Sequence, residues 1–128
     1  MLENSNGSKV WYVADGWIPF KTADKDPSYV GHESLMILNY NDVLAKIYLD
    51  IYFENNDPIK NIELEVMPER VKCFRMDNPN DIGGVKLKRL EQYALRIKSN
   101  IDIVVQFGRM DITQPNLAYM GYIAFPGK

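Results

Sequence analysis

The chain has 128 residues, a formal net charge of -2 at pH 7, and a composition that is 46% hydrophobic and 25% charged. This length predicts one domain whose core needs neither a disulfide nor a metal to hold it. The acidic balance argues against a general electrostatic attraction to nucleic acid, so we expect nucleic-acid binding to be absent. The composition is that of an ordinary globular protein.

Signals for processing and redox chemistry are sparse. Cys73 is the only cysteine, which excludes an internal disulfide and a Cys-x-x-Cys motif. Residues 1–9 lack the charged start and apolar core of a signal peptide, and no apolar run approaches the roughly 18 residues that span a bilayer. We therefore expect a cytoplasmic protein that forms a single domain over residues 1–128, with residues 1–9 frayed.

Short apolar runs alternate with turn signals along the chain, which predicts strands. A period of two is clearest over residues 45–54, where every second side chain is apolar. The run Leu35–Leu38 is too continuous for a half-exposed strand. The predicted strands cover residues 10–14, 33–39, 45–54, 62–66, 70–76, a segment that starts at Tyr93, residues 99–111 and residues 118–125.

Residues 85–98 fit two patterns, since apolar side chains recur there both at helical spacing and, from Tyr93 onwards, at every second position. The strands expected on both sides favour a strand from Tyr93, and residues 85–92 remain undecided between helix and strand. The connection over residues 20–31 is long and polar, which is typical of a functional or mobile loop.

About eight short strands separated by turns predict an all-β fold, either a sandwich or a barrel. No internal repeat, low-complexity segment or linker divides the chain. We predict a single β-sandwich domain.

The strand over residues 99–111 opens on the turn signal Ser99-Asn100 and ends in an amide, a guanidinium and a carboxylate. If this strand is buried, all three polar groups need partners. Arg109 and Asp111 share one face, and the planar fork of Arg109 suits a carboxylate, a phosphate or a sugar hydroxyl. The alternative is a structural ion pair of Arg109 with Asp111 or Glu33.

Gln106 precedes these two residues on the same strand. It points to the opposite face if the strand is regular, whereas a bulge at Gly108 would reorient it.

His32 is the only histidine and stands next to Glu33. It is a candidate general base, oriented by Glu33 or Asp111, but one histidine cannot build a metal site by itself. The blander alternative, a histidine that caps a loop as it enters a strand, is the more common one. Glu33 and Asp111 are also candidates for the pair of catalytic carboxylates of a glycosidase. No nucleophile elbow is present, and we expect no catalytic residue, no metal and no cofactor.

Two further groups of side chains have simple structural explanations. Five basic residues could meet phosphates, although a solvated strand face explains them better: Lys86, Lys88, Arg89, Arg96 and Lys98. Five aromatic residues could stack on a sugar, although core or subunit-interface positions are simpler: Trp11, Tyr12, Trp17, Tyr48 and Tyr52.

Taken together, several segments resemble the sensory rhodopsin transducer family of small bacterial and archaeal proteins. They occur in the family's order and spacing over nearly the whole chain: Gly16-Trp17-Ile18-Pro19, His32-Glu33, Ile37-Leu38-Asn39, Ile51-Tyr52-Phe53, Asp57-Pro58, Pro68 with Arg70, Ser99-Asn100, Ile103–Gln106, Arg109, Asp111 and Gln114. The chain departs from the family pattern at Phe107-Gly108, where a His-Thr pair is expected, and residues 86–92 are more basic than expected.

The resemblance implies a jelly-roll-like β-sandwich that assembles as a homotetramer. It also implies a soluble signalling role beneath a membrane photoreceptor in the members that gave the family its name. For relatives without such a receptor, a role in binding a small or carbohydrate-like ligand has been suspected. No enzymatic activity is implied.

We therefore predict a non-catalytic module for signalling or ligand binding, acting with a membrane photoreceptor or another signalling protein. The predicted ligand site consists of Trp17, His32, Glu33, Arg109 and Asp111, with Arg109 as the anchor for an anionic or hydroxyl-rich ligand. One alternative is a homo-oligomeric scaffold with no small ligand. A less favoured alternative is a hydrolase that uses His32 or the carboxylates.

Overall fold

The computed structural model describes residues 7–21, 29–113 and 117–127 of the chain. Within these ranges the protein has eight strands, a single 3-10 turn (η1, Pro79–Asp81) and no α-helix, so the predicted all-β class is confirmed. The strands are β1 (Ser8–Trp17), β2 (His32–Asn39), β3 (Ala45–Phe53), β4 (Ile59–Val66), β5 (Arg70–Arg75), β6 (Gln92–Asp111), β7 (Ala118–Ile123) and β8 (Phe125–Gly127). No helix in the described ranges is long and apolar enough to cross a membrane.

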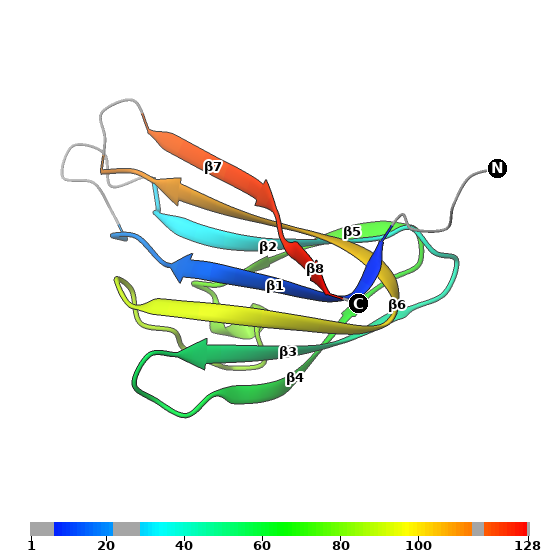
Figure 1. The fold of residues 1–128 in the computed structure, drawn as a ribbon. Helices are drawn as coiled ribbons and strands as arrows, with labels where there is room; N and C mark the ends of the chain where they lie inside the picture. The colour runs from blue at the N-terminus through cyan, green and yellow to red at the C-terminus, as the bar shows by residue number, and fades with distance from the viewer. Residues whose placement is uncertain (1–6, 22–28, 114–116, 128) are drawn as a thin grey trace.

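Strand β6 organises the fold because it belongs to two layers. Its first part pairs with β1 and β3, and its second part pairs with β2 and β7, always antiparallel. Figure 1 shows β6 curving round at one end of the molecule between these two parts. We call β4, β3, the first part of β6, β1 and β8 layer A, and β5, β2, the second part of β6 and β7 layer B. The eight strands thus form one hydrogen-bonded network folded into a sandwich-like domain.

The turn expected at Ser99-Asn100 is therefore wrong, since both residues lie inside β6. Ser99 pairs with Ile47, and the side-chain carbonyl of Asn100 accepts a hydrogen bond from the Lys46 backbone at 2.8 Å. Pairing with β3 keeps this segment extended, although its residue types favour a turn.

The core lies between the two layers. Ile47, Leu49 and Ile51 of layer A, with Leu35 and Ile37 of layer B, are at most 1% exposed, which confirms the alternation predicted for β3. They belong to one continuous cluster of buried side chains. Each such side chain contributes roughly 1.5–3 kcal/mol by leaving water.

Several predicted boundaries shift. Strand β1 runs on to Trp17, and the fully buried Ile18 follows it directly. Residues 85–91 form neither helix nor strand, and β6 begins at Gln92. Of residues 1–9, which were expected to be frayed, residues 1–6 lie outside the described ranges, whereas Ser8 and Lys9 belong to β1. Most of the predicted 20–31 loop, residues 22–28, also lies outside these ranges.

The prediction that Leu35–Leu38 is buried on both faces is wrong for the isolated chain. Leu38 is 41% exposed and Met36 is half-buried, whereas Leu35 and Ile37 are fully buried. Alternate residues of β2 point away from the core, and the outward ones are nevertheless apolar.

Asn39 connects the end of β2 to two other segments from a fully buried position. Its amide nitrogen donates to the carbonyl oxygens of Val43, Val66 and Met67 at 2.8, 3.1 and 3.2 Å. Its side-chain oxygen accepts from the Asn41 backbone at 3.0 Å. Both halves of the amide are thus satisfied, as burial of a polar group requires.

Replacing Asn39 by Ala should lower the free energy of unfolding by about 1–3 kcal/mol, because it removes the amide whose two N–H groups serve three carbonyl groups, including the buried contact with Val66. Urea denaturation followed by circular dichroism measures the loss. The exposed Asn55, in the turn after β3, is the matched control, and Asn55→Ala should change stability by less than about 0.5 kcal/mol. Equal losses in the two variants would contradict this account of Asn39.

Candidate functional site

Glu33 is the centre of a polar cluster between the two layers, and its side chain is 0% exposed. One carboxylate oxygen accepts from the Trp17 backbone N–H at 2.8 Å and from the Tyr93 hydroxyl at 2.5 Å. The other oxygen accepts from Arg109 Nε at 2.8 Å. We call Trp17, Glu33, Tyr93 and Arg109 the Glu33 cluster. It connects β2 and the end of β6 in layer B to β1 and the start of β6 in layer A.

The strand register explains why these side chains meet. Glu33 and Arg109 are directly opposite each other on β2 and β6, so their side chains lie on the same inward face. Tyr93 lies on the inward face of layer A together with Leu95, and both are 2% exposed. A carboxylate placed at this depth is stable only when donors surround it, and three donors do.

Arg109 also donates to layer A, through its Nη2 atom. Its Nη2 lies 3.3 Å from Asp15 Oδ1 and 3.2 Å from the Asp15 carbonyl oxygen. The guanidinium carbon lies 5.8 Å from the centre of the Trp17 ring, which is a cation–π distance. Gln92 also donates to Asp15 Oδ1, at 3.1 Å. The side chain of Arg109 is only 17% exposed and forms ion pairs with Glu33 and Asp15.

Burial shifts the protonation of this cluster. Desolvation raises the pKa of Glu33 above its ordinary value, and the donors Tyr93, Arg109 and Trp17 offset that rise only in part. The pKa of Tyr93 lies well above its ordinary range, first because the hydroxyl is buried and then because the Glu33 charge is close. Tyr93 therefore keeps its proton and remains a hydrogen-bond donor at neutral pH.

Three of the five predicted site residues, Trp17, Glu33 and Arg109, come together. Two do not. His32 follows the outward face of layer B, opposite Met110, and its Nδ1 lies 2.8 Å from the carbonyl oxygen of Val30.

Asp111 shares the inward side of β6 with Arg109 but makes its hydrogen bonds elsewhere. Its Oδ1 accepts from the Thr113 backbone at 2.9 Å and from the Thr113 hydroxyl at 2.6 Å. Asp111 thus holds the turn that follows β6 and does not reach Glu33 or Arg109 in an ion pair.

The region around Gly108 is regular. Ser34, Gly108 and Gly121 are cross-strand neighbours with no register shift, so no bulge forms there. Gln106 accordingly stays on the outward face of layer B, opposite in direction to Arg109.

Sequence reasoning missed Tyr93, Asp15 and Gln92 as members or neighbours of this cluster. In the sequence, Tyr93 only begins an alternating pattern of apolar residues. Nothing near it indicates that its hydroxyl binds a residue 60 positions earlier. Asp15 stands beside Gly16, directly after the strand predicted over residues 10–14. No local signal connects these residues to Glu33.

A hollow of about 360 Å³ lies against Trp17, where the end of β3 meets the start of β6. Its wall consists of one indole, two other apolar side chains, three amides and two carboxylates: Trp17, Phe53, Leu90, Asn55, Asn56, Gln92, Glu54 and Glu91. Trp17 and Gln92 also contact the Glu33 cluster or Asp15, so this hollow adjoins the cluster.

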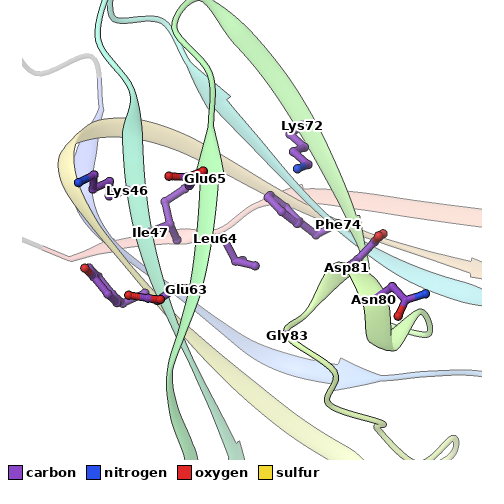
Figure 2. Close-up of a pocket in the computed structure, with 11 residues that line it drawn as sticks. Lys46, Ile47, Glu63, Leu64, Glu65, Lys72, Phe74, Asn80, Asp81 and Gly83 are labelled. Atoms are coloured by element: carbon purple, nitrogen blue, oxygen red, sulfur yellow. The ribbon is translucent and has the colours of Figure 1, made fainter.

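A second hollow, of about 560 Å³, lies at the open side of the sandwich between the edge strands β4 and β5 and beside η1. Figure 2 shows Leu64 and Phe74 pointing toward one another across it, with Lys72 above and Asp81 below. The Lys72 ammonium lies 5.1 Å from the centre of the Phe74 ring. A third hollow, of about 660 Å³, surrounds the β4–β5 turn near Met67 and Val71. Neither of these two hollows is lined by a residue of the predicted site.

Three of the five basic residues singled out in the sequence, Arg89, Arg96 and Lys98, bind other groups of the protein. Arg96 and Lys98 both bind the fully buried carboxylate of Asp50, at 2.9 and 3.1 Å. Arg89 donates to the carbonyl oxygens of Pro19 and Gly31 at 3.0 and 2.7 Å. In the described residues no group of three or more His, Cys, Asp and Glu side chains is placed to hold a metal ion.

The fold and the Glu33 cluster define a small all-β protein whose two layers are joined by one curved strand and closed by a buried ion pair. A family model described as the Anabaena sensory rhodopsin transducer matches residues 6–126. The chain belongs to this family, which confirms the resemblance inferred from its motifs.

Two solved structures support the assignment. The structure titled Thermotoga maritima 1070 has a TM-score of 0.82 and 29% sequence identity, and the match covers 95% of this chain and 97% of that one. The Anabaena sensory rhodopsin transducer has a TM-score of 0.68 and 32% identity, covering 80% of this chain and 88% of that one. The comparison with curated proteins finds no match.

The raised pKa of Glu33 predicts how its contribution to stability depends on pH. A carboxyl whose pKa is higher in the folded than in the unfolded state favours folding below its unfolded pKa, about 4.3, and loses that contribution as pH rises through the folded value. The stability of the wild type relative to Glu33→Gln should therefore fall between pH 4 and 7.5 in urea titrations. A difference that grows with pH would show that the Arg109 ion pair outweighs burial.

Asp50 predicts the opposite dependence. Burial alone would raise its pKa, but the hydrogen bond from the Asn61 backbone and the contacts of Lys98 and Arg96 lower it overall. Its contribution is present above the unfolded pKa of about 3.9 and is lost as pH falls through the folded value. The stability of the wild type relative to Asp50→Asn should therefore fall on acidification, in the same titration. A flat difference would contradict the assigned pKa direction.

Proposed function

We propose that this protein is a non-catalytic, cytoplasmic signalling module that binds a small hydroxyl-rich, carbohydrate-like ligand in the hollow beside Trp17 and acts as a homo-oligomer. One observation carries the ligand proposal. Trp17 contributes both to the wall of that hollow and to the Glu33 cluster. A molecule in the hollow would touch the residue whose backbone holds the buried carboxylate.

The chemistry of the wall favours hydroxyl groups. An indole provides a flat apolar surface, and neighbouring amides and carboxylates offer both donors and acceptors to a polyol. Glu54 and Glu91 add negative charge to the wall, and Arg109 is already occupied by Glu33 and Asp15. A neutral hydroxyl-rich ligand therefore suits the hollow better than the anionic one that the sequence also allowed.

The same arrangement offers a route for a signal. A ligand shifts a conformational equilibrium only by its difference in affinity for the two states. A state in which the Trp17 backbone moves weakens the 2.8 Å hydrogen bond that its N–H donates to Glu33. Because that bond connects layer A to layer B, ligand binding at Trp17 would bias the relative position of the layers.

Family membership supports a signalling partner. One structural relative is named for transducing a signal from a sensory rhodopsin. By that analogy we propose that the partner is a membrane photoreceptor or another signalling protein. The homotetramer implied by the family resemblance is proposed on the same ground.

A homo-oligomeric scaffold without a small ligand is the second candidate. The observation in its favour is the set of large apolar side chains exposed on β7, where Tyr119, Met120 and Ile123 are 52, 57 and 59% exposed. A hydrolase has less support, since His32 and Glu33 follow opposite faces of β2. Activity that disappears in His32→Ala would favour it nonetheless.

A thermal-shift panel of monosaccharides, disaccharides and organic acids tests the ligand proposal. A sugar that binds only the folded state at a hundredfold excess over its Kd should stabilise the protein by about 2.7 kcal/mol. Trp17→Ala should abolish this shift and Asn56→Ala should reduce it, each measured against the variant's own midpoint. Tyr12→Ala, which removes an exposed aromatic residue outside the hollow, is the control and should keep it.

A shift that survives Trp17→Ala would place the sugar elsewhere. A panel with no saturable shift would leave the scaffold as the better account. Organic acids that bind in preference to sugars would overturn the argument from the charge of the wall.

A further inference from the structure

The hollow beside Trp17 carries negative charge that no cation of its own wall balances. Glu54 and Glu91 both line it, and none of its described lining residues is a lysine, an arginine or a histidine. Among the described residues, neither of these two carboxylates belongs to an ion pair. Both residues are exposed, so their oxygens are accessible to a ligand.

The strand register brings the two carboxylates to one end of layer A. Phe53, the last residue of β3, pairs with Tyr93 of β6. Glu54 follows this pair by one residue and Glu91 precedes it by two, so both stand at the same end of neighbouring strands (Figure 1). Neighbouring strands lie about 4.8 Å apart, and at that spacing one small cationic group can reach both carboxylates.

The charged groups next to the wall do not offset this charge. The Arg109 guanidinium is already paired with Glu33 and Asp15. Asp15 in turn accepts a hydrogen bond at 3.1 Å from Gln92, which lines the hollow, and so brings a further carboxylate close to the wall. A ligand in the hollow therefore meets the two glutamates without a competing cation from Arg109.

The other two hollows differ in this respect, because each contains charges of both signs. Between β4 and β5, two lysines accompany three carboxylates, and Lys46 and Glu65 are cross-strand neighbours (Figure 2). Around the β4–β5 turn, two basic side chains accompany one carboxylate. Of the three hollows, only the one beside Trp17 has acidic side chains alone.

The indole of Trp17 suits a ligand that is both apolar and cationic. An aromatic ring has two faces, and the Arg109 guanidinium lies over one of them at 5.8 Å. A ligand in the hollow therefore meets the other face or the edge of the ring. The π face attracts a cation, and its flat apolar surface packs against the C–H groups of a sugar ring.

Leu90 shows that this wall is held in place at a cost. Its φ angle of 65° is left-handed, which is unfavourable for a residue with a side chain. Its N–H donates to the carbonyl oxygen of Ile18 at 2.8 Å, and this bond holds Leu90 and the following Glu91 near Trp17. Backbone strain of this kind is common at binding sites, where the surrounding structure maintains it.

We infer that the ligand of this hollow is an amino sugar, a hydroxyl-rich ring that carries one protonated amine. The amine has three N–H donors and a positive charge, which match the carboxylates of Glu54 and Glu91. The amides of the wall remain for the ring hydroxyls, as in the proposed function. A neutral sugar would leave both charges unpaired. The inference rests on the proposed sugar site and names the class of its ligand.

Matched pairs of sugars test the inference by isothermal titration calorimetry at low salt. The pairs are glucose with glucosamine, galactose with galactosamine, and mannose with mannosamine. At pH 6.5 an amine is protonated if its pKa is near that of an α-amino group, about 7.7. In a pair whose ring fits, the amino sugar should bind about fivefold to tenfold more tightly than its neutral partner, and this ratio should approach one in 1 M salt.

Variants assign the preference to the wall. Glu54→Gln and Glu91→Gln should each lower the ratio of the two affinities about twofold to threefold, and the double variant should bring it near one. Glu63→Gln is the matched control, since Glu63 is an exposed glutamate on β4 outside this hollow, and it should keep the wild-type ratio. Circular dichroism shows that each variant is folded before it is compared.

Methylamine controls for plain attraction of cations to the carboxylates. It carries the charge but lacks the ring that would contact Trp17 and the amides, so it should show no saturable binding at the concentrations used for the sugars.

The outcomes separate the inference from the function it rests on. Neutral sugars that bind as tightly as their amino partners would overturn the inference and leave the sugar site standing. A preference for the amine that survives the double variant, or methylamine that binds as tightly as the amino sugar, would also overturn the inference alone. If neither member of any pair binds, both the inference and the proposed sugar ligand fail.

Discussion

The buried carboxylate of Glu33 is the interaction on which the rest of this structure depends. The curve of β6 joins the two layers at one end of the sandwich, and side chains hold them together near the opposite end. Glu33 does this by taking donors from β1 and from both parts of β6. A buried ion pair contributes little net stability against an apolar substitute, but removing one partner is costly. The cluster therefore specifies how the layers meet.

This constraint changes what Arg109 does. A guanidinium at the end of a strand suits an incoming anion, but here its Nε and one Nη already bind Glu33 and Asp15. The residue that remains available is Trp17, which faces a hollow with one part and supports Glu33 with another. Trp17 thus has a structural role at Glu33 and lines the hollow of the proposed ligand site. This double role is why a ligand in the hollow would influence the joint between the layers.

The two outer faces differ in their chemistry. Layer A carries paired charges, among them the buried Asp50 with Arg96 and Lys98, which are compatible with water. Layer B carries an apolar face on strands whose inner sides already pack in the core. The hollow beside Trp17 belongs to layer A, and the Glu33 cluster lies between that hollow and the strands of layer B.

The sequence alone determined the all-β class and the alternation of β3, because these depend on the period of the apolar side chains. It also limited the ion-pair partners of Arg109 to Asp111 and Glu33, because a buried polar group needs a partner. The tertiary structure decided which partner Arg109 takes, since Glu33 lies 76 residues away in the chain. It also decided that Ser99-Asn100 continues a strand and that Leu38 points outward. The local sequence pattern shows which residues alternate between the two faces of a strand. Which residue lies opposite each of these depends on the pairing of strands that are distant in the sequence.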